Sequence, residues 1–171
     1  IEKPQHYWES PAGSAHYPLT PSPGRDYGAF YFMAHAGNVP TLRASAFWKL
    51  LAGLRDADGQ LRIYPGSPYI ALLTAGAGRY TFCDIDADSL RTIQQAARQL
   101  PVRATVQCVQ DEGIECLWRG AQNLADHTAA AQVLAFIDPY RSHEPGPRGQ
   151  SSLDLWGELA KKGGGAERVK Q

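Results

Sequence analysis

The feature that most constrains the fold of this chain is an alternation of short apolar runs with segments of helical periodicity. Short apolar runs bounded by turn residues are typical of strands covered on both faces, as in a parallel sheet. The runs that predict strands cover residues 28–34, 79–86, 102–110 and 132–140. The segments that predict helices are 42–54, 68–75, 89–100, 113–121 and 152–162. Strands that alternate with helices in this way predict an α/β fold with a mostly parallel sheet and right-handed crossovers.

The length and composition fit one compact domain preceded by an irregular segment. The chain has 171 residues, of which 43% are hydrophobic and 20% are charged, so a buried core can form. Residues 1–27 contain five prolines and no sustained periodicity. We interpret residues 1–27 as an irregular, Pro-rich N-terminal arm and residues 28–171 as the α/β domain.

Charge and cysteine content argue against several classes of protein. Seventeen Lys and Arg residues balance seventeen Asp and Glu residues, which disfavours a protein whose affinity depends on neutralising many phosphates. No apolar run approaches the roughly 20 residues of a membrane helix, and no signal-peptide core begins the chain. Cys83, Cys108 and Cys116 have no CxxC spacing, and the five histidines have no metal-ligand spacing. We therefore expect reduced thiols, no metal site, no membrane partner and a cytoplasmic location.

Each predicted strand delivers polar side chains at its carboxyl end. In chain order they are His35 with Asn38, then Asp84, then Asp111 or Glu112, then Asp138. Ligands of open α/β sheets bind beyond the carboxyl ends of the strands, so this shared position favours a binding site. The alternative is that polar residues follow strands because loops are hydrated.

Asp84, Asp138 and Ser67 can each be interpreted as a ligand-binding residue, and the segments that contain them also have an ordinary structural interpretation. An acid at the end of a second strand, such as Asp84, accepts hydrogen bonds from a ribose diol in nucleoside-binding folds, whereas the acids at 86 and 88 fit helix capping, with Asp88 as the expected N-cap. Asp138 precedes Pro139 and Tyr140, which fits a carboxylate for a substrate amine beside a stacking surface, or an ordinary turn. Ser67 could bind a ligand or cap the helix that follows it.

These segments, in this order, resemble the Rossmann-type S-adenosylmethionine-dependent methyltransferases. The likeness is nearest to the RlmJ-type ribosomal-RNA adenine methyltransferases, and the three-Cys-motif partner proteins are also similar. The matching stretches are FYFMAHAGN, YPGSPYIALL, FCDIDADSL, VQDEGIECL and AFIDPY. The resemblance implies a Rossmann-like class I methyltransferase fold with the cofactor across the strand ends. Further strands normally follow the fourth, so we expect a sheet that is reduced or incomplete toward its C-terminal end.

The resemblance also implies roles for individual residues. His35, with Gly37 and Asn38 of the same loop, and Ser67 would contact S-adenosylmethionine. Asp84 would hold the ribose hydroxyls, and Asp111 would approach the adenine edge. The implied catalytic residues are Asp138, which would orient the accepting group, and Tyr140, which would stack on the substrate.

The sequence departs from the family in two motifs. An acid usually precedes the first-loop histidine, and Met33 takes its place here, while Asn38-Val39 replaces a small Ala-Gly pair. The catalytic segment has one proline in place of Asp-Pro-Pro-Tyr. We expect a methyltransferase for a nitrogen or oxygen nucleophile of a small molecule or peptide, with bulk nucleic acid disfavoured by charge. The alternatives are a fold reused for a lyase or hydrolase reaction and a non-catalytic binding partner.

Overall fold

The computed structural model describes residues 3–20, 28–123, 132–138, 145 and 149–162. The chain divides into two compact units, one formed by Ile1–Ala15 with Ser67–Gln171 and the other by His16–Gly66. Among the described residues, no helix has the length and apolar character needed to cross a membrane.

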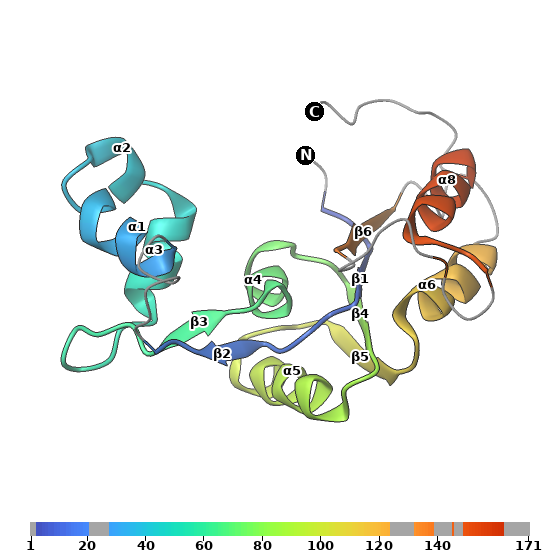
Figure 1. The fold of residues 1–171 in the computed structure, drawn as a ribbon, viewed down its shortest axis with the longest axis horizontal. Helices are drawn as coiled ribbons and strands as arrows, with labels where there is room; N and C mark the ends of the chain where they lie inside the picture. The colour runs from blue at the N-terminus through green and yellow to red at the C-terminus, as the bar shows by residue number, and fades with distance from the viewer. Residues whose placement is uncertain (1–2, 21–27, 124–131, 139–144, 146–148, 163–171) are drawn as a thin grey trace. The chain divides into compact units, whose positions relative to one another are not determined.

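The first unit is built on a four-stranded sheet in which each pair of neighbouring strands is parallel (Figure 1). The strands are β1 (His6–Ser10), β4 (Arg79–Asp84), β5 (Thr105–Gln110) and β6 (Val133–Ile137). Their order in the sheet is β5-β4-β1-β6. The chain therefore steps outward from β1 to β4 and β5 and then returns to the other side of β1, which is the doubly wound, Rossmann-like pattern. The reversal lies between β1 and β6, where such folds bind their ligands.

Helices cover both faces of this sheet. They are α4 (Ser67–Thr74), α5 (Ala87–Gln99), α6 (Gly113–Gln122) and α8 (Ser152–Lys162). On one face, Tyr7 and Phe82 pack with Leu72 and Ile93 of α4 and α5. On the other face, Trp8 and Cys83 pack with apolar residues of α6 and α8. Adjacent residues of a strand point to opposite faces, so Tyr7 and Trp8 of β1 contribute to opposite cores.

The expectation of an irregular arm is wrong for residues 6–10 and 16–18, which form β1 and β2. β1 has neighbours on both sides, β4 and β6. Its sequence, HYWES, has no apolar run, although four of its five residues are buried. Sequence patterns detect a strand through its apolar side chains, and this strand has few of them.

The second unit contains a two-stranded antiparallel sheet and three helices. The elements are β2 (His16–Pro18), α1 (Ala29–Ala36), α2 (Pro40–Arg43), α3 (Ala46–Gly53) and β3 (Ile63–Pro65). Met33, Leu51 and Leu61 form its buried core. The strand predicted at 28–34 is therefore wrong, because this run forms α1. Ala29, Phe32, Met33 and Ala36 turn inward at helical spacing, and a short apolar run fits either structure by composition alone.

The expectation of three reduced thiols is wrong for two of them. Cys83 of β4 and Cys116 of α6 form a disulfide, with their Cα atoms 6.6 Å apart, within the range that a disulfide bridges. Cys108 is free, and burial raises the pKa of its thiol to about 11. A separation of 33 residues in sequence gives no sign of this pair, since only the packing of α6 on the sheet brings the two cysteines together.

Candidate functional site

The carboxyl end of β1 holds two buried polar side chains. Glu9 is 0% exposed and Ser10 is 1% exposed. The Tyr7 hydroxyl donates a hydrogen bond to Glu9 Oε2 at 2.9 Å. Among the described residues, neither Glu9 Oε1 nor Ser10 Oγ has a hydrogen-bond partner of ordinary geometry. Buried polar atoms are nearly always paired, so two unpaired atoms at the reversal point of the sheet mark this position as a candidate binding site.

The surroundings of Glu9 favour its neutral form. Burial is the main cause that raises the pKa of Glu9 to about 7, and the charge of Asp138 raises it further. The hydroxyls of Ser67 and Tyr7 act in the opposite direction. Burial and the nearby charge of Glu9 raise the pKa of Tyr7 well above its ordinary range, so the Tyr7 hydroxyl remains a donor.

The loop after β1 is held by hydrogen bonds to its neighbours. The N–H of Ala12 donates to the Cys83 carbonyl at 2.9 Å, and the N–H of Gly13 donates to Asp84 Oδ2 at 2.7 Å. The N–H of Ala15 donates to Thr92 Oγ1 at 2.9 Å. Gly13 has a φ of 62°, in the left-handed region where glycine has no steric penalty. The loop therefore has one defined path past the ends of β1 and β4.

Asp84 closes β4 and accepts two backbone hydrogen bonds. Its side chain receives the N–H of Gly13 at Oδ2 and the N–H of Asp86 at Oδ1, the second at 2.9 Å. Asp84 is 7% exposed. Each carboxylate oxygen has two lone pairs, so Asp84 can still accept a bond from a ligand while it fixes the loop.

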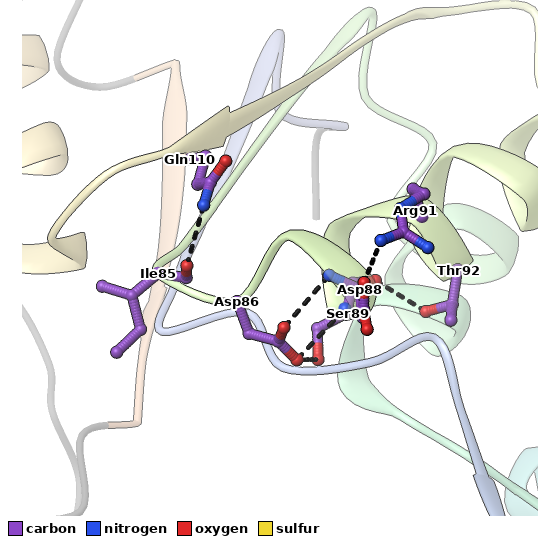
Figure 2. Close-up of polar contacts among 7 residues, drawn as sticks. All are labelled: Ile85, Asp86, Asp88, Ser89, Arg91, Thr92 and Gln110. Atoms are coloured by element: carbon purple, nitrogen blue, oxygen red, sulfur yellow. Dashed lines mark hydrogen bonds and ion pairs between the residues drawn. The ribbon is translucent and has the colours of Figure 1, made fainter.

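The segment after Asp84 caps α5 and presents an apolar side chain (Figure 2). The N-cap is Asp86, which accepts the N–H groups of Asp88 and Ser89, so the expected cap at Asp88 is wrong by two residues. Ile85 is 72% exposed, and its carbonyl accepts a hydrogen bond from the Gln110 side chain at 3.2 Å (Figure 2). This bond joins the ends of β4 and β5.

Asp111 follows β5 and organises the start of α6. Its N–H donates to the Asp84 carbonyl at 3.1 Å. Its side chain accepts the N–H of Glu112 at 2.8 Å and forms an ion pair with Arg119. The carboxylate predicted to approach adenine is thus bound to its own helix.

Asp138 and Ser67 lie near the end of β1. The N–H of Asp138 donates to the Ser10 carbonyl at 3.3 Å, and the charge of the Asp138 side chain raises the pKa of the Glu9 carboxyl. Asp138 is exposed and Ser67 is half-buried, at the start of α4. The sequence-predicted Ser67, Asp84, Asp111 and Asp138 therefore all belong to the unit that holds the parallel sheet. Tyr140 lies outside the described residues.

His35, Gly37 and Asn38 do not follow a strand. His35 lies in the last turn of α1, and Gly37 and Asn38 follow this helix, in the unit formed by His16–Gly66. The His35 ring stacks on Tyr31 with a centroid separation of 3.9 Å, and its Nδ1 donates to the Tyr31 carbonyl at 2.8 Å. The strand-end argument that assigned cofactor contacts to these three residues is therefore wrong.

Sequence reasoning missed Glu9 and Gly13. The available signal is the string ESPAGSA at residues 9–15, an acid followed by small residues with a glycine. An acid and a glycine are the residue types whose expected places are taken by Met33 and Val39. The strand that carries Glu9 was missed because it is five residues long and has no apolar run.

Among the described residues, no group of three His, Cys, Asp or Glu side chains could hold a metal ion. The described site consists of carboxylates, hydroxyls and backbone N–H groups around the ends of parallel strands. It lies where the strand order of this Rossmann-like sheet reverses, the position at which doubly wound α/β folds bind ligands.

Comparison with known proteins identifies a shared fold. No family model and no curated protein matches the chain. The crystal structure of protein LPL1258 from Legionella pneumophila str. Philadelphia 1, described with the family model DUF519, matches with a TM-score of 0.68. The two sequences are 21% identical, and the match covers 95% of this chain and 57% of that chain. The chain thus has the fold of this DUF519 protein and spans a little over half of its length.

Proposed function

We propose that the protein is an S-adenosylmethionine-dependent methyltransferase that acts on a nitrogen or oxygen nucleophile. The observation that carries the proposal is Glu9, a fully buried carboxyl group at the reversal point of a doubly wound parallel sheet, one of whose oxygens has no hydrogen-bond partner in the described part of the chain. The methyl donor is a nucleoside with a cationic amino-acid group. Such a ligand suits the carboxyl ends of β1 and β4, where adjacent strands each carry a carboxyl group.

The residues present fit the donor. Glu9 would receive its ammonium group, and Ser67, whose hydroxyl lowers the pKa of Glu9, would contact the same amino-acid part. Asp84 would accept the ribose hydroxyls with lone pairs that the two backbone N–H groups leave free. The exposed Ile85 and the neighbouring Asp111 would contact the adenine ring.

The sulfonium of S-adenosylmethionine supplies an already activated methyl group when it is bound, so positioning provides much of the catalysis. Asp138 is exposed beside the end of β1. Its carboxylate would accept a hydrogen bond from the nucleophile, orient its lone pair toward the donor and take up its proton. Tyr140 would stack on a planar acceptor.

Family resemblance supports the same activity. DUF519 is the family of the RlmJ-like methyltransferases, and the stretches YPGSPYIALL, FCDIDADSL, VQDEGIECL and AFIDPY resemble that family independently of the fold comparison. Glu9 and Gly13 would provide the acid and the glycine of the first motif, in place of Met33 and the Asn38-Val39 pair. The balanced charge of the chain favours a small molecule or a peptide as acceptor over bulk nucleic acid.

A second candidate is a binding protein that keeps this fold without methyl transfer. The two acids proposed to contact the nucleoside already have partners within the protein, and this favours the second candidate. Asp84 accepts two backbone N–H groups, and Asp111 pairs with Arg119. A ligand must share Asp84 with the loop and compete with Arg119 for Asp111.

Calorimetry with S-adenosylmethionine and S-adenosylhomocysteine tests the proposal. We expect saturable binding and a rise in thermal stability, since a ligand at about 100 times its Kd stabilises a protein by about 2.7 kcal/mol. Transfer of a labelled methyl group is then measured to small amines, peptides and RNA. Asp138→Asn should retain binding and lose transfer by about 100-fold or more. Absence of binding to both nucleosides would refute the proposal, and binding without transfer to any acceptor class would favour the second candidate.

A further inference from the structure

The Glu9 carboxyl group is enclosed by groups that do not neutralise a negative charge. Tyr7 of the same strand donates one hydrogen bond to Oε2. The Ser67 hydroxyl of α4 lowers the pKa of Glu9, and the charge of the Asp138 carboxylate after β6 raises it. Tyr80 of β4 raises the pKa of Tyr7. Among the described residues that influence its ionisation, none is a cation. An ionised Glu9 would therefore be a buried anion beside a second anion.

Such an arrangement favours a proton on Glu9 when no ligand is bound. Burial of an uncompensated carboxylate is costly, and a buried acid responds by keeping its proton. The unpaired Oε1 can carry that proton without breaking the bond that Tyr7 makes to Oε2. A cation that arrives beside Oε1 reverses this preference, because the ion pair stabilises the charged form.

We propose that Glu9 selects ligands by charge and that its carboxyl group releases its proton when the ammonium group of an S-adenosyl ligand binds beside it. The inference rests on the proposed function and adds a coupling between ligand binding and proton release. The O–H bond of Glu9 breaks, the proton passes to the buffer, and the carboxylate pairs with the ammonium. No electron is transferred and no other bond changes.

The affinity of a ligand for this site then depends on its charge and on the pH. A ligand with an ammonium group gains affinity as the pH rises toward the pKa of Glu9, by up to about tenfold per pH unit where the acid is protonated. A neutral nucleoside gains nothing from this ionisation. The site therefore discriminates between S-adenosylhomocysteine, which has the amino-acid group, and 5′-methylthioadenosine, which lacks it.

The test is isothermal titration calorimetry of the full chain near pH 6, in two buffers with different ionisation enthalpies. Near this pH an α-amino group is fully protonated, so the ligand contributes no proton change. We expect S-adenosylhomocysteine to release about one proton and 5′-methylthioadenosine to release none. Glu9→Gln should abolish the proton release and reduce the affinity ratio of the two ligands by about tenfold or more. Glu158→Gln, a half-buried glutamate of α8, is the matched control and should behave as wild type.

The outcomes separate the two proposals. Binding of S-adenosylhomocysteine with no proton release overturns the charge-selection inference and leaves the proposed function standing. Proton release that persists in Glu9→Gln assigns the proton to another group and also overturns the inference. Absence of binding by any S-adenosyl compound overturns the proposed function together with the inference that rests on it.

Discussion

The ends of β1 and β4 lie side by side in the sheet, and each holds a buried carboxyl group in a different environment. Asp84 at the end of β4 has a backbone N–H on each oxygen. Glu9 at the end of β1 has one donor, Tyr7, on one oxygen and none of ordinary geometry on the other among the described residues. Both carboxyl groups are buried, but they differ in how many of their oxygens accept a hydrogen bond. This difference separates a carboxyl group that the fold uses from one that is available to a ligand.

The physical reason lies in where the donors come from. The N–H groups on Asp84 belong to a fixed loop and to the turn before α5, so this acid links three segments of chain. The surroundings of Glu9 come from hydroxyls and a second carboxylate, which leave charge uncompensated. Four substitutions test whether the two carboxyl groups differ in this way.

The largest expected effect is that of Asp84→Ala. The substitution leaves the N–H groups of Gly13 and Asp86 without their acceptor, and each unsatisfied group costs about 1–3 kcal/mol. We expect a loss of about 3 kcal/mol in the free energy of unfolding, measured by urea denaturation. Asp88→Ala, which removes an exposed pair with Arg91, is the control and should have no measurable effect. Equal stability of the two variants would contradict the anchoring role.

Glu9→Gln tests the other side of the comparison through pH. The pKa of Glu9 is raised from an ordinary 4.5 to about 7 in the folded protein, so the folded state binds the proton more tightly than the unfolded state. The contribution of Glu9 to the free energy of unfolding is complete below its pKa in the unfolded state. This contribution is lost as the pH rises through about 7, its pKa in the folded state.

The stability of Glu9→Gln relative to wild type should therefore increase between pH 4.5 and pH 8. The increase should reach about 2–3 kcal/mol, since one pKa unit corresponds to about 1.4 kcal/mol. Denaturation at several pH values measures this difference, with Glu158→Gln as the control. Parallel curves for Glu9→Gln and wild type would show that Glu9 is ionised in both states.

Gly113→Ala tests how tightly the end of β1 is packed. A Cβ atom at Gly113 would lie 1.9 Å from Ser10 Oγ, so Ser10 or α6 must move. Overpacking of this kind costs about 1–3 kcal/mol, and we expect about 2 kcal/mol by thermal denaturation. Gly157→Ala in α8 is the control, because nothing lies within 4 Å of its added Cβ and alanine favours the helix. Two variants of equal stability would argue against this close approach.

The smallest expected effect is that of Ser67→Ala. The Ser67 hydroxyl lowers the pKa of Glu9, so its removal should move the pH midpoint of the Glu9 contribution upward and reduce stability at pH 8 by less than about 1 kcal/mol. The control is Thr74→Ala at the other end of α4, whose hydroxyl donates to the Ile70 carbonyl. A midpoint unchanged by Ser67→Ala, or moved equally by Thr74→Ala, would separate Ser67 from Glu9.

The sequence predicted the parallel α/β class because three of the four strands in the parallel sheet are apolar or alternating segments followed by helical ones. The strands β4, β5 and β6 and helix α8 lie where periodicity indicated them. The same patterns located Asp84, Asp111 and Asp138 after strands. Local chemistry is sufficient for these elements, since alternation and helical spacing reflect burial directly.

The segment at 29–36 and strand β1 show where local patterns fail. Residues 29–36 are apolar enough for a strand and form α1, whereas HYWES is polar enough for a loop and forms β1, between β4 and β6. The buried environment of Glu9 depends on residues far away in sequence, Ser67 and Asp138. Such contacts have no local signature.

By itself the sequence determined that this chain forms strands alternating with helices and that acids follow the strands, because side-chain periodicity and turn residues act over a few positions. The tertiary structure decided which segment takes the position between β4 and β6, which cysteines pair, and which carboxyl group keeps an unpaired oxygen. Those outcomes depend on which distant groups become neighbours, and the order of strands in a sheet is set by packing and chain connectivity, not by local sequence.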